Sequence, residues 1–191
     1  MIHSSRFSAL LDANVLYPAS IRDILLHFAS EDLYKPKWTD KIHEEWIRNL
    51  LFNRQDLTKE SLLSAQAAMD TAFPDANILQ YESLITSLSL PDEDDRHILA
   101  AAIKDKVDVI VTFNTKDFPA EAVKDFDIEV QHPDNFVSNL IQLDESKAKK
   151  AFRNQVRNLK KPPKTGEEVL ATLSNAGLPQ SVVKLKALLS I

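Results

Sequence analysis

Short apolar runs along the chain alternate with longer segments in which apolar residues recur at helical spacing. Three runs have the length of buried strands, at residues 7–11, 107–113 and 128–130. Four segments have helical periodicity, at residues 21–30, 40–52, 59–71 and 91–106. Because strands that alternate with helices are typical of βα units, we predict an α/β fold with a small, mostly parallel sheet.

The pattern changes after about Leu143. Three helices are expected beyond this point, at residues 146–160, 165–175 and 182–189. The first is basic and amphipathic, and Thr165-Gly-Glu-Glu168 has the spacing of a capping box, which typically begins a helix. We therefore predict two domains, residues 1–143 and a C-terminal helical extension at residues 144–191.

The composition excludes several classes of enzyme. The chain has no cysteine, which removes disulfides, cysteine–zinc sites and thiol nucleophiles. Its two glycines, Gly166 and Gly177, lie near the C-terminus. Walker loops, dinucleotide-binding loops and nucleophile elbows need glycine within their motifs, so none is expected. There is no run of 18 apolar residues, and MIHSSRF lacks a signal-peptide core, so we expect a soluble cytoplasmic protein.

Charge is unevenly distributed. Residues 1–141 contain 13 basic and 24 acidic residues, whereas residues 142–191 contain 10 and 4. The acidic part alone is poorly suited to phosphate, so a nucleic-acid ligand would need bound cations, the basic tail or a local basic patch.

Four acidic residues belong to elements that a parallel sheet would bring together. Asp12 and Asp117 each follow an apolar run, and Glu45 and Asp95 lie in predicted helices. Ligands in such sheets bind at the carboxyl ends of the strands, so we expect these acids in one crevice. Carboxylate oxygens suit Mg²⁺ or Mn²⁺. The expected activity is metal-dependent hydrolysis of a phosphate ester.

Asp95 carries the clearest signal of the four. At 100° per residue it lies in the middle of an apolar face that is formed by Ile98, Leu99, Ala102 and Ile103. An unpaired carboxylate on that face would be costly to bury, which favours a cation site. The alternative is stabilisation of the first helical turn, which accounts well for Asp92, Glu93 and Asp94.

The adjacent acids Glu44 and Glu45 are only weakly separated by the sequence. Glu44 has Arg48 four residues on, so an exposed ion pair on the helix accounts for it, and Glu45 has no such partner. His43 and His97 lie near candidate ligands, but a core or surface histidine is the commoner outcome and no histidine pair has zinc-type spacing.

Three further polar residues are candidates to support the site. Asn14 lies two residues after Asp12, where its amide could bond the carboxylate. Thr112 and Asn114 share a turn with Asp117. Such side chains often serve only to satisfy backbone groups, but their place at the end of a strand favours a second role.

These motifs resemble those of PIN-domain ribonucleases, and specifically of the VapC-type toxins of toxin–antitoxin pairs. The matching segments are LLDANVLYPASIRDILL, PKWTDKIHEEWIRNL, DEDDRHILAAAIKDKVDVIVTFNTKDFP and HPDNFVSNLI. They cover most of residues 8–141. The segment LKKPPKTGEEVLATLSNAGLPQSVVKLK resembles the extra C-terminal helical domain of one VapC subgroup.

The resemblance implies a three-layer α/β/α PIN-like fold and metal-dependent hydrolysis of RNA phosphodiester bonds. It places the acidic metal ligands at Asp12, Glu45, Asp95 and Asp117, and so prefers Glu45 to Glu44. Thr112 and Asn114 match the polar turn near the metal. Many relatives carry Asp where this chain has Asn14 and Asn114, so binding of one or of two ions stays open.

The resemblance also implies products with a 5′-phosphate and a 3′-hydroxyl, a cognate antitoxin and a homodimer. Arg22 and Arg96 are candidates for phosphate contacts near the site. Ion pairs with the neighbouring acids, Asp23 and Asp94, explain these two arginines equally well.

Two other functions compete with this interpretation. A haloacid-dehalogenase-type phosphatase also places an Asp after its first strand, but it needs a second Asp where this chain has Asn14. The other rival is a PIN-like module that binds RNA or protein without catalysis, and only turnover separates it from a nuclease.

Overall fold

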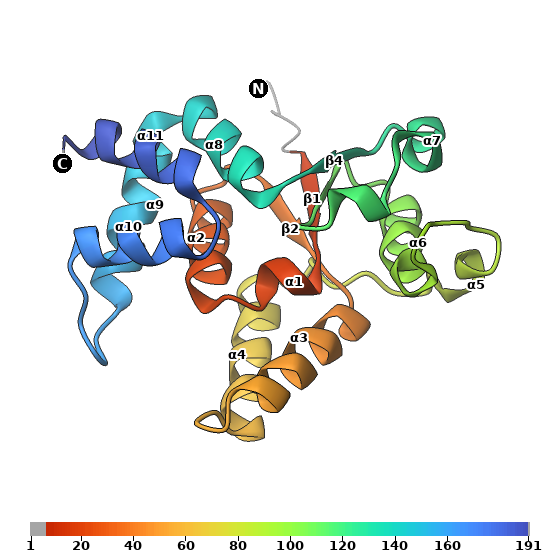
Figure 1. Ribbon diagram of the computed structural model, residues 1–191, viewed down its shortest axis with the longest axis horizontal. Helices are drawn as coiled ribbons and strands as arrows, with labels where there is room; N and C mark the ends of the chain where they lie inside the picture. Colours follow the sequence, from red (N-terminus) through yellow and green to blue (C-terminus); the bar gives the residue numbers. More distant parts are fainter. Residues whose placement is uncertain (1–6, 191) are drawn as a thin grey trace. The chain divides into compact units, whose positions relative to one another are not determined.

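The computed structural model describes residues 7–190, which group into two compact units (Figure 1). The first, here called the sheet unit, comprises Phe7–Tyr17 and Lys35–Gln131. The second, the helical unit, contains Pro18–Tyr34 and the chain from His132 onwards. The expectation about a signal peptide rests largely on residues 1–6, which lie outside the described residues.

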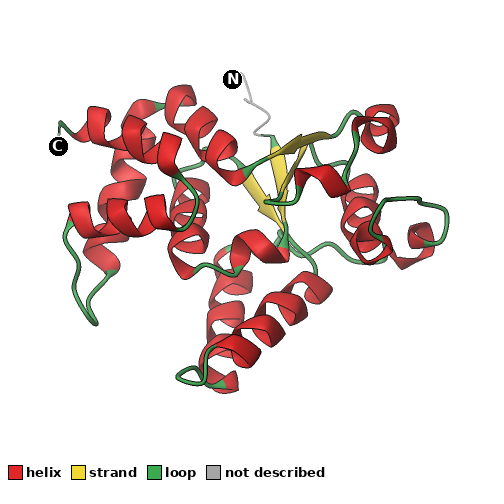
Figure 2. Ribbon diagram, viewed as in Figure 1, coloured by secondary structure: helices red, strands yellow, loops and turns green. Residues whose placement is uncertain are grey.

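Four parallel strands form the sheet, in the order β2-β1-β3-β4 (Figure 2). Their bounds are Ser8–Leu11 for β1, Lys35–Lys37 for β2, Val109–Val111 for β3 and Glu129–Gln131 for β4. The two central strands are apolar and buried, and Leu11 of β1 is in register with Val111 of β3. The predicted α/β class with a parallel sheet is confirmed.

The strand β2 was not predicted from the sequence. Its residues are Lys-Pro-Lys, and proline cannot donate a backbone hydrogen bond to a neighbouring strand. The structure accommodates Pro36 because β2 lies at the edge of the sheet, where it pairs on one side only.

Helices and short 3₁₀ turns complete the sheet unit. The helices are α1 (Ala13–Leu16), α3 (Asp40–Asn53), α4 (Lys59–Ala72), α5 (Glu82–Ile85), α6 (Arg96–Asp105) and α7 (Ala120–Val123). The 3₁₀ turns are η1 (Glu93–Asp95), η2 (Thr115–Asp117) and η3 (Lys124–Phe126). The single helix predicted at residues 91–106 is therefore a 3₁₀ turn followed by α6. Trp38 and Trp46 are completely buried in the core.

The described residues of the helical unit form five helices. They are α2 (Ala19–Ser30), α8 (Pro133–Leu143), α9 (Glu145–Asn158), α10 (Gly166–Asn175) and α11 (Pro179–Leu189). Although α2 lies early in the sequence, it packs against α9 and α10. The predicted capping box is confirmed, since Thr165 N donates to Glu168 at 2.7 Å and Glu168 N donates to Thr165 Oγ1 at 3.2 Å. The domain boundary predicted after residue 143 stays a prediction, and α8 belongs to the same compact unit as the later helices.

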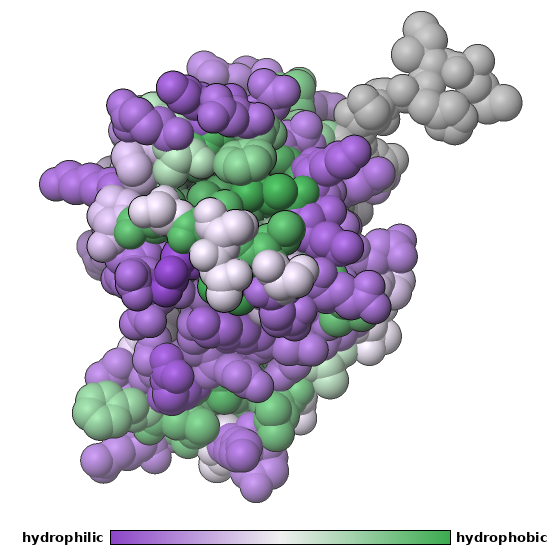
Figure 3. Space-filling view, turned by 90° about the vertical axis from the view of Figure 1, so that its right-hand side faces the viewer, coloured by the Kyte–Doolittle hydropathy of each residue, from purple (hydrophilic) through white to green (hydrophobic). Residues whose placement is uncertain are grey.

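Polar residues predominate on the face of the molecule that Figure 3 shows, where purple residues surround a green, hydrophobic area in the upper part and smaller green areas in the lower part. None of the helices within residues 7–190 has the length and apolar character needed to cross a membrane.

Candidate active site

The carboxyl ends of the two central strands bring Asp12 and Thr112 side by side. Asp12 N donates to Val111 O at 3.1 Å, which continues the pairing of β1 with β3 by one residue. The Thr112 hydroxyl then donates to Asp12 Oδ2 at 2.6 Å. Adjacent parallel strands thus join two predicted site residues that lie 100 positions apart in the chain.

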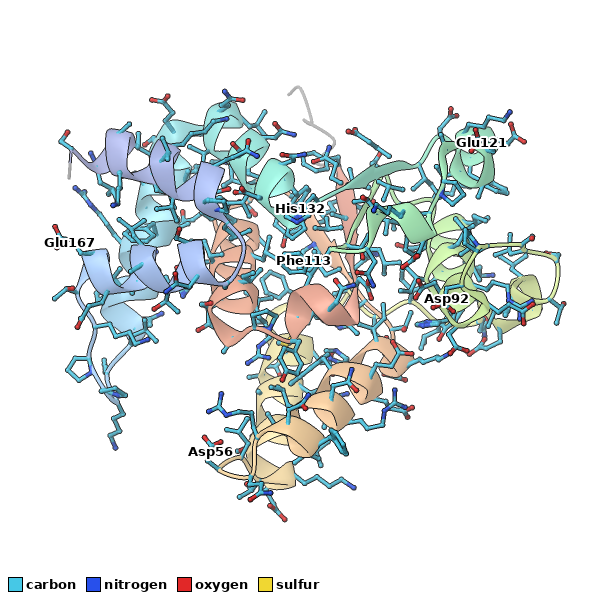
Figure 4. The ribbon with its side chains drawn as sticks, in the orientation of Figure 1. Asp56, Asp92, Phe113, Glu121, His132 and Glu167 are labelled. Carbon is cyan, nitrogen blue, oxygen red and sulfur yellow. The ribbon has the colours of Figure 1, made fainter. Side chains whose placement is uncertain are left out.

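Asn14 completes a small hydrogen-bond network around this carboxylate. Its Nδ2 donates to Asp12 Oδ2 at 2.6 Å and lies 3.0 Å from Thr112 Oγ1, while its Oδ1 accepts from Phe113 N at 3.1 Å. Figure 4 labels Phe113 in the turn after β3. Because the amide is held at both ends, it fixes one oxygen of Asp12 in a single orientation.

Asp12 is 5% exposed, and its burial raises the pKa of its carboxyl above the ordinary value. Hydrogen bonds from Thr112 and from the Ala13 backbone oppose that change, and the charge of Glu45 adds to it. Burial thus opposes a negative charge on Asp12, and a cation nearby would stabilise the carboxylate.

Glu45 projects from α3 toward the buried His97 of α6. Glu45 Oε1 lies 3.1 Å from His97 Nε2 and 4.0 Å from Lys41 Nζ. The expectation that Glu45 has no ion-pair partner was therefore wrong: the partner on its own helix lies four residues before it. His97 is 2% exposed, and its Nδ1 is buried without a hydrogen-bond partner in the described structure. This histidine orients the Glu45 carboxylate.

Asp95 ends the 3₁₀ turn η1 at the start of α6, and its side chain makes no capping hydrogen bond. Asp92 caps this turn instead, by accepting from Asp94 N at 2.9 Å. Burial, together with the charges of Asp12, Asp92, Asp117 and Glu45, raises the pKa of Asp95 to about 7. Helix capping therefore does not explain Asp95, and its surroundings disfavour a negative charge.

Asp117 and Asn114 lie in the turn after β3. Asp117 belongs to η2, and its charge contributes to the raised pKa of Asp95. Asn114 is exposed, and its backbone N–H donates to Thr112 Oγ1 at 3.0 Å. The structure thus connects Asn114 to the site through its backbone, and Asp117 through the field it exerts on Asp95.

The two candidate arginines each interact with a nearby acid, Arg96 by direct contact and Arg22 through the charge of Asp23. Arg96 donates to Glu93, with Nη2 2.9 Å from the carboxylate and Nε 3.0 Å from the backbone oxygen. The alternative partner expected for Arg96 was Asp94, so this detail is corrected. Arg22 lies in α2 of the helical unit, where burial lowers its pKa and Asp23 opposes the change. A phosphate contact by either arginine stays a prediction.

An open cavity of about 530 Å³ gathers three of the four candidate acids together with Asn14, whereas Asp117, Thr112, Asn114 and Arg96 are not among its lining residues. Its lining residues are Asp12, Ala13, Asn14, Tyr17, Lys41, Glu45, Arg48, Asn49, Asn53, Asp94 and Asp95. Glu44 lines a different depression, which shares Arg48 with this cavity and also includes Asp40, Ile47, Leu51 and others. The structure therefore separates the two adjacent glutamates and places Glu45 with the other acids.

Sequence interpretation missed one wall of this cavity. Lys41, Arg48, Asn49 and Asn53 come from α3, as Glu45 does. Their spacing of three and four residues follows the helical period, so a helical projection that starts from Glu45 could have identified them. Arg48 was passed over because an ion pair with Glu44 accounted for it.

The donor groups of the acidic cluster are those that a hard divalent cation prefers. Within residues 7–190, however, no three His, Asp or Glu side chains are arranged so as to hold a metal ion. One oxygen of Asp12 is bonded to Thr112 and Asn14, and Glu45 is turned to His97. The site is a cluster of acids with the right chemistry rather than a closed coordination shell.

Comparisons with known proteins agree with this architecture. The family model of the PIN domain matches residues 8–116, and that of the VapC50 C-terminal domain matches residues 133–187. A protein of Mycobacterium tuberculosis described as "Putative ribonuclease VapC50" is 34% identical over 125 residues, which cover 65% of this chain and 70% of that protein. No solved structure matches the chain at comparable significance. The chain belongs to the PIN-domain family, in the VapC-type group that carries a VapC50 C-terminal domain.

Proposed function

We propose that this protein is a metal-dependent endoribonuclease and the toxin component of a type II toxin–antitoxin pair. One observation carries the proposal: Asp12, Glu45 and Asp95 line a single cavity, and Asp117 acts electrostatically on Asp95. These four acids come from separate stretches of the chain, and their mutual repulsion favours a site that a cation neutralises. The family and the similarity to a protein described as a ribonuclease support RNA as the substrate.

The four acids Asp12, Glu45, Asp95 and Asp117 would hold Mg²⁺ or Mn²⁺, because carboxylate oxygens are the ligands that these ions prefer. The bound ion would supply a water of lowered pKa and would neutralise charge that develops on the phosphate.

The protein groups have distinct roles in this scheme. Thr112 and Asn14 donate hydrogen bonds to Oδ2 of Asp12 and so fix the orientation of its carboxylate. The direction of the second oxygen is fixed by the same orientation. His97 orients the Glu45 carboxylate through the 3.1 Å contact between His97 Nε2 and Glu45 Oε1. Charged groups that are already oriented can stabilise the transition state without the free-energy cost of reorienting them during the reaction.

A cognate antitoxin, a homodimeric assembly and action in the cytoplasm follow from the same proposal. The antitoxin is expected to bind the toxin and suppress RNA cleavage. Co-purification with the product of an adjacent gene, combined with a measurement of molecular mass in solution, would test the partner and the assembly together.

The activity itself is tested with purified protein and RNA. We expect cleavage in Mg²⁺ or Mn²⁺, loss of cleavage with a chelator, and recovery when the ion is restored. Sequencing of the fragment ends should find 5′-phosphates. Absence of cleavage of any cellular RNA, with the metal present and the antitoxin removed, would favour the non-catalytic module. A covalent phosphate on Asp12 would favour the phosphatase.

The two adjacent glutamates provide a matched pair of variants. Glu45→Gln is expected to lower the cleavage rate by about 100-fold, because it removes a charge from the cavity beside His97. Glu44→Gln removes the same charge one residue away, from a side chain that lines a different depression, and should cleave at nearly the wild-type rate. Single-turnover rates compare the two, and equal losses would remove Glu45 from the site.

A further inference from the structure

The cavity has two walls of opposite character. One is acidic and includes Asp12 and Asp95. The other follows α3 away from Glu45 and presents Arg48, Asn49 and Asn53. From Glu45 to Asn53 the helix rises about 12 Å at 1.5 Å per residue, so this wall extends well beyond the acids.

We propose that Arg48, Asn49 and Asn53, with Tyr17 beside them, form a track for single-stranded RNA next to the bond that is cut. The inference rests on the proposed nuclease function and adds to it the residues that hold the substrate. The track is defined by these four residues.

Charge is the first argument for the track. The acids that would bind the metal also repel RNA, so a polyanion needs a cation close to them. Arg48 and Lys41 are the basic residues lining the cavity, and Lys41 is 4.0 Å from Glu45. Arg48 is exposed and three residues beyond Glu45 on the helix, which suits a phosphate next to the reacting one.

The neutral residues of the track are the second argument. Asn49 and Asn53 are exposed on the same wall, and their amides carry both donors and acceptors for base edges or the 2′-hydroxyl. Tyr17 is half-buried at the cavity and presents an aromatic ring of the kind on which unpaired bases stack. Accessible bases of this kind occur in single-stranded RNA, because a paired A-form helix hides them.

Arg54, at the C-terminal end of α3, provides a control for Arg48. Its guanidinium donates twice to Asp56, at 2.8 and 2.6 Å, and it does not line the cavity. Figure 4 labels Asp56 at the end of the α3–α4 pair that lies farther from Asp92. Asp92 directly precedes the turn η1, which contains Asp95. Arg54→Gln removes the same charge as Arg48→Gln, from a side chain that is paired with Asp56 and does not line the cavity.

The test measures RNA binding without cleavage. A short, fluorescently labelled single-stranded RNA is titrated with the Asp95→Asn protein in a chelator, over a series of salt concentrations. Arg48→Gln, introduced into the Asp95→Asn protein, should weaken RNA binding about tenfold. It should also reduce the magnitude of the slope of the logarithm of the association constant against the logarithm of salt concentration by about 0.7, the value for one phosphate contact on a single strand. Asn53→Ala should weaken binding and leave the slope unchanged. Arg54→Gln should change neither.

The outcomes separate the track from the nuclease. Equal effects of Arg48→Gln and Arg54→Gln, or no measurable binding in the parent protein, would overturn the track. Binding that depends on Arg48, in a wild-type protein that fails to cleave RNA with Mg²⁺ or Mn²⁺, would overturn the nuclease instead. Equal affinity for single-stranded DNA of the same sequence would remove RNA as the preferred ligand.

Discussion

Asp12→Asn is expected to reduce RNA cleavage in Mg²⁺ by about 1,000-fold or more, which corresponds to about 4 kcal/mol of lost transition-state stabilisation. The fold should be retained, since the asparagine oxygen can still accept the hydrogen bonds that Thr112 and Asn14 donate to Asp12 Oδ2. The substitution removes the charge and keeps the shape. Single-turnover cleavage and circular dichroism measure the two effects separately.

Asp108→Asn is the matched control for this prediction. Asp108 precedes the other end of β3, where Oδ2 accepts from Ser8 N at 2.7 Å and from Ser8 Oγ at 3.1 Å. The substitution removes the same charge, should lower the stability by no more than about 1 kcal/mol, and should leave the cleavage rate unchanged. Cleavage by Asp12→Asn within tenfold of the wild type would remove Asp12 from the reaction.

The sequence predicts the centre of the site because strand ends have a simple geometry. Asp12 and Thr112 each follow a short apolar run, and parallel pairing makes their neighbourhood almost unavoidable. Asp95 was identifiable because a carboxylate in line with an apolar helical face needs an explanation. In both cases local pattern and overall topology lead to the same residues.

Contacts between distant side chains were not predictable in this way. The pairing of Glu45 with His97 depends on how α3 and α6 approach each other, which periodicity does not encode. The cavity wall on α3 went unrecognised because its exposed polar residues stand out only in a helical projection that starts from Glu45, and the sequence separated Glu45 from Glu44 only weakly.

Backbone chemistry and helix packing account for two other differences. The edge strand β2 was not predicted because it contains Pro36, and proline is unfavourable in a strand. Proline is tolerated here because an edge strand pairs on one side only. Helix α2 was correctly expected as a helix, but its packing against α9 and α10 was not, because an amphipathic face shows that a partner exists without identifying it.

Asp95→Asn should have two opposite effects, a loss of cleavage as large as that of Asp12→Asn and a gain in stability of the metal-free protein. The folded protein raises the pKa of Asp95 from 3.8 to about 7, so between these values it binds a proton more tightly than the unfolded chain does. Its stability consequently falls as pH rises from about 4 to 7, and the whole penalty is present above pH 7. Asparagine carries no such penalty.

The gain is expected to be on the order of 1–2 kcal/mol at pH 8, below the full value of the shift because solvent screens a half-buried group. Thermal unfolding in a chelator should show a melting temperature about 2–6 °C higher than wild type at pH 8 and little gain at pH 4. Asp125→Asn, which removes an exposed acid outside the cavity, should show no such dependence.

The effect of magnesium on the melting temperature distinguishes a metal site from a cluster of acids that merely repel one another. An ion that binds the folded state should stabilise the wild type at pH 8 by occupying the place where the charges repel, and should stabilise Asp95→Asn much less. If magnesium raises both melting temperatures equally, the ion binds elsewhere. If the wild type is as stable as Asp95→Asn at pH 8 without metal, the four acids do not repel one another as proposed, and the main physical reason for a cation among them is lost.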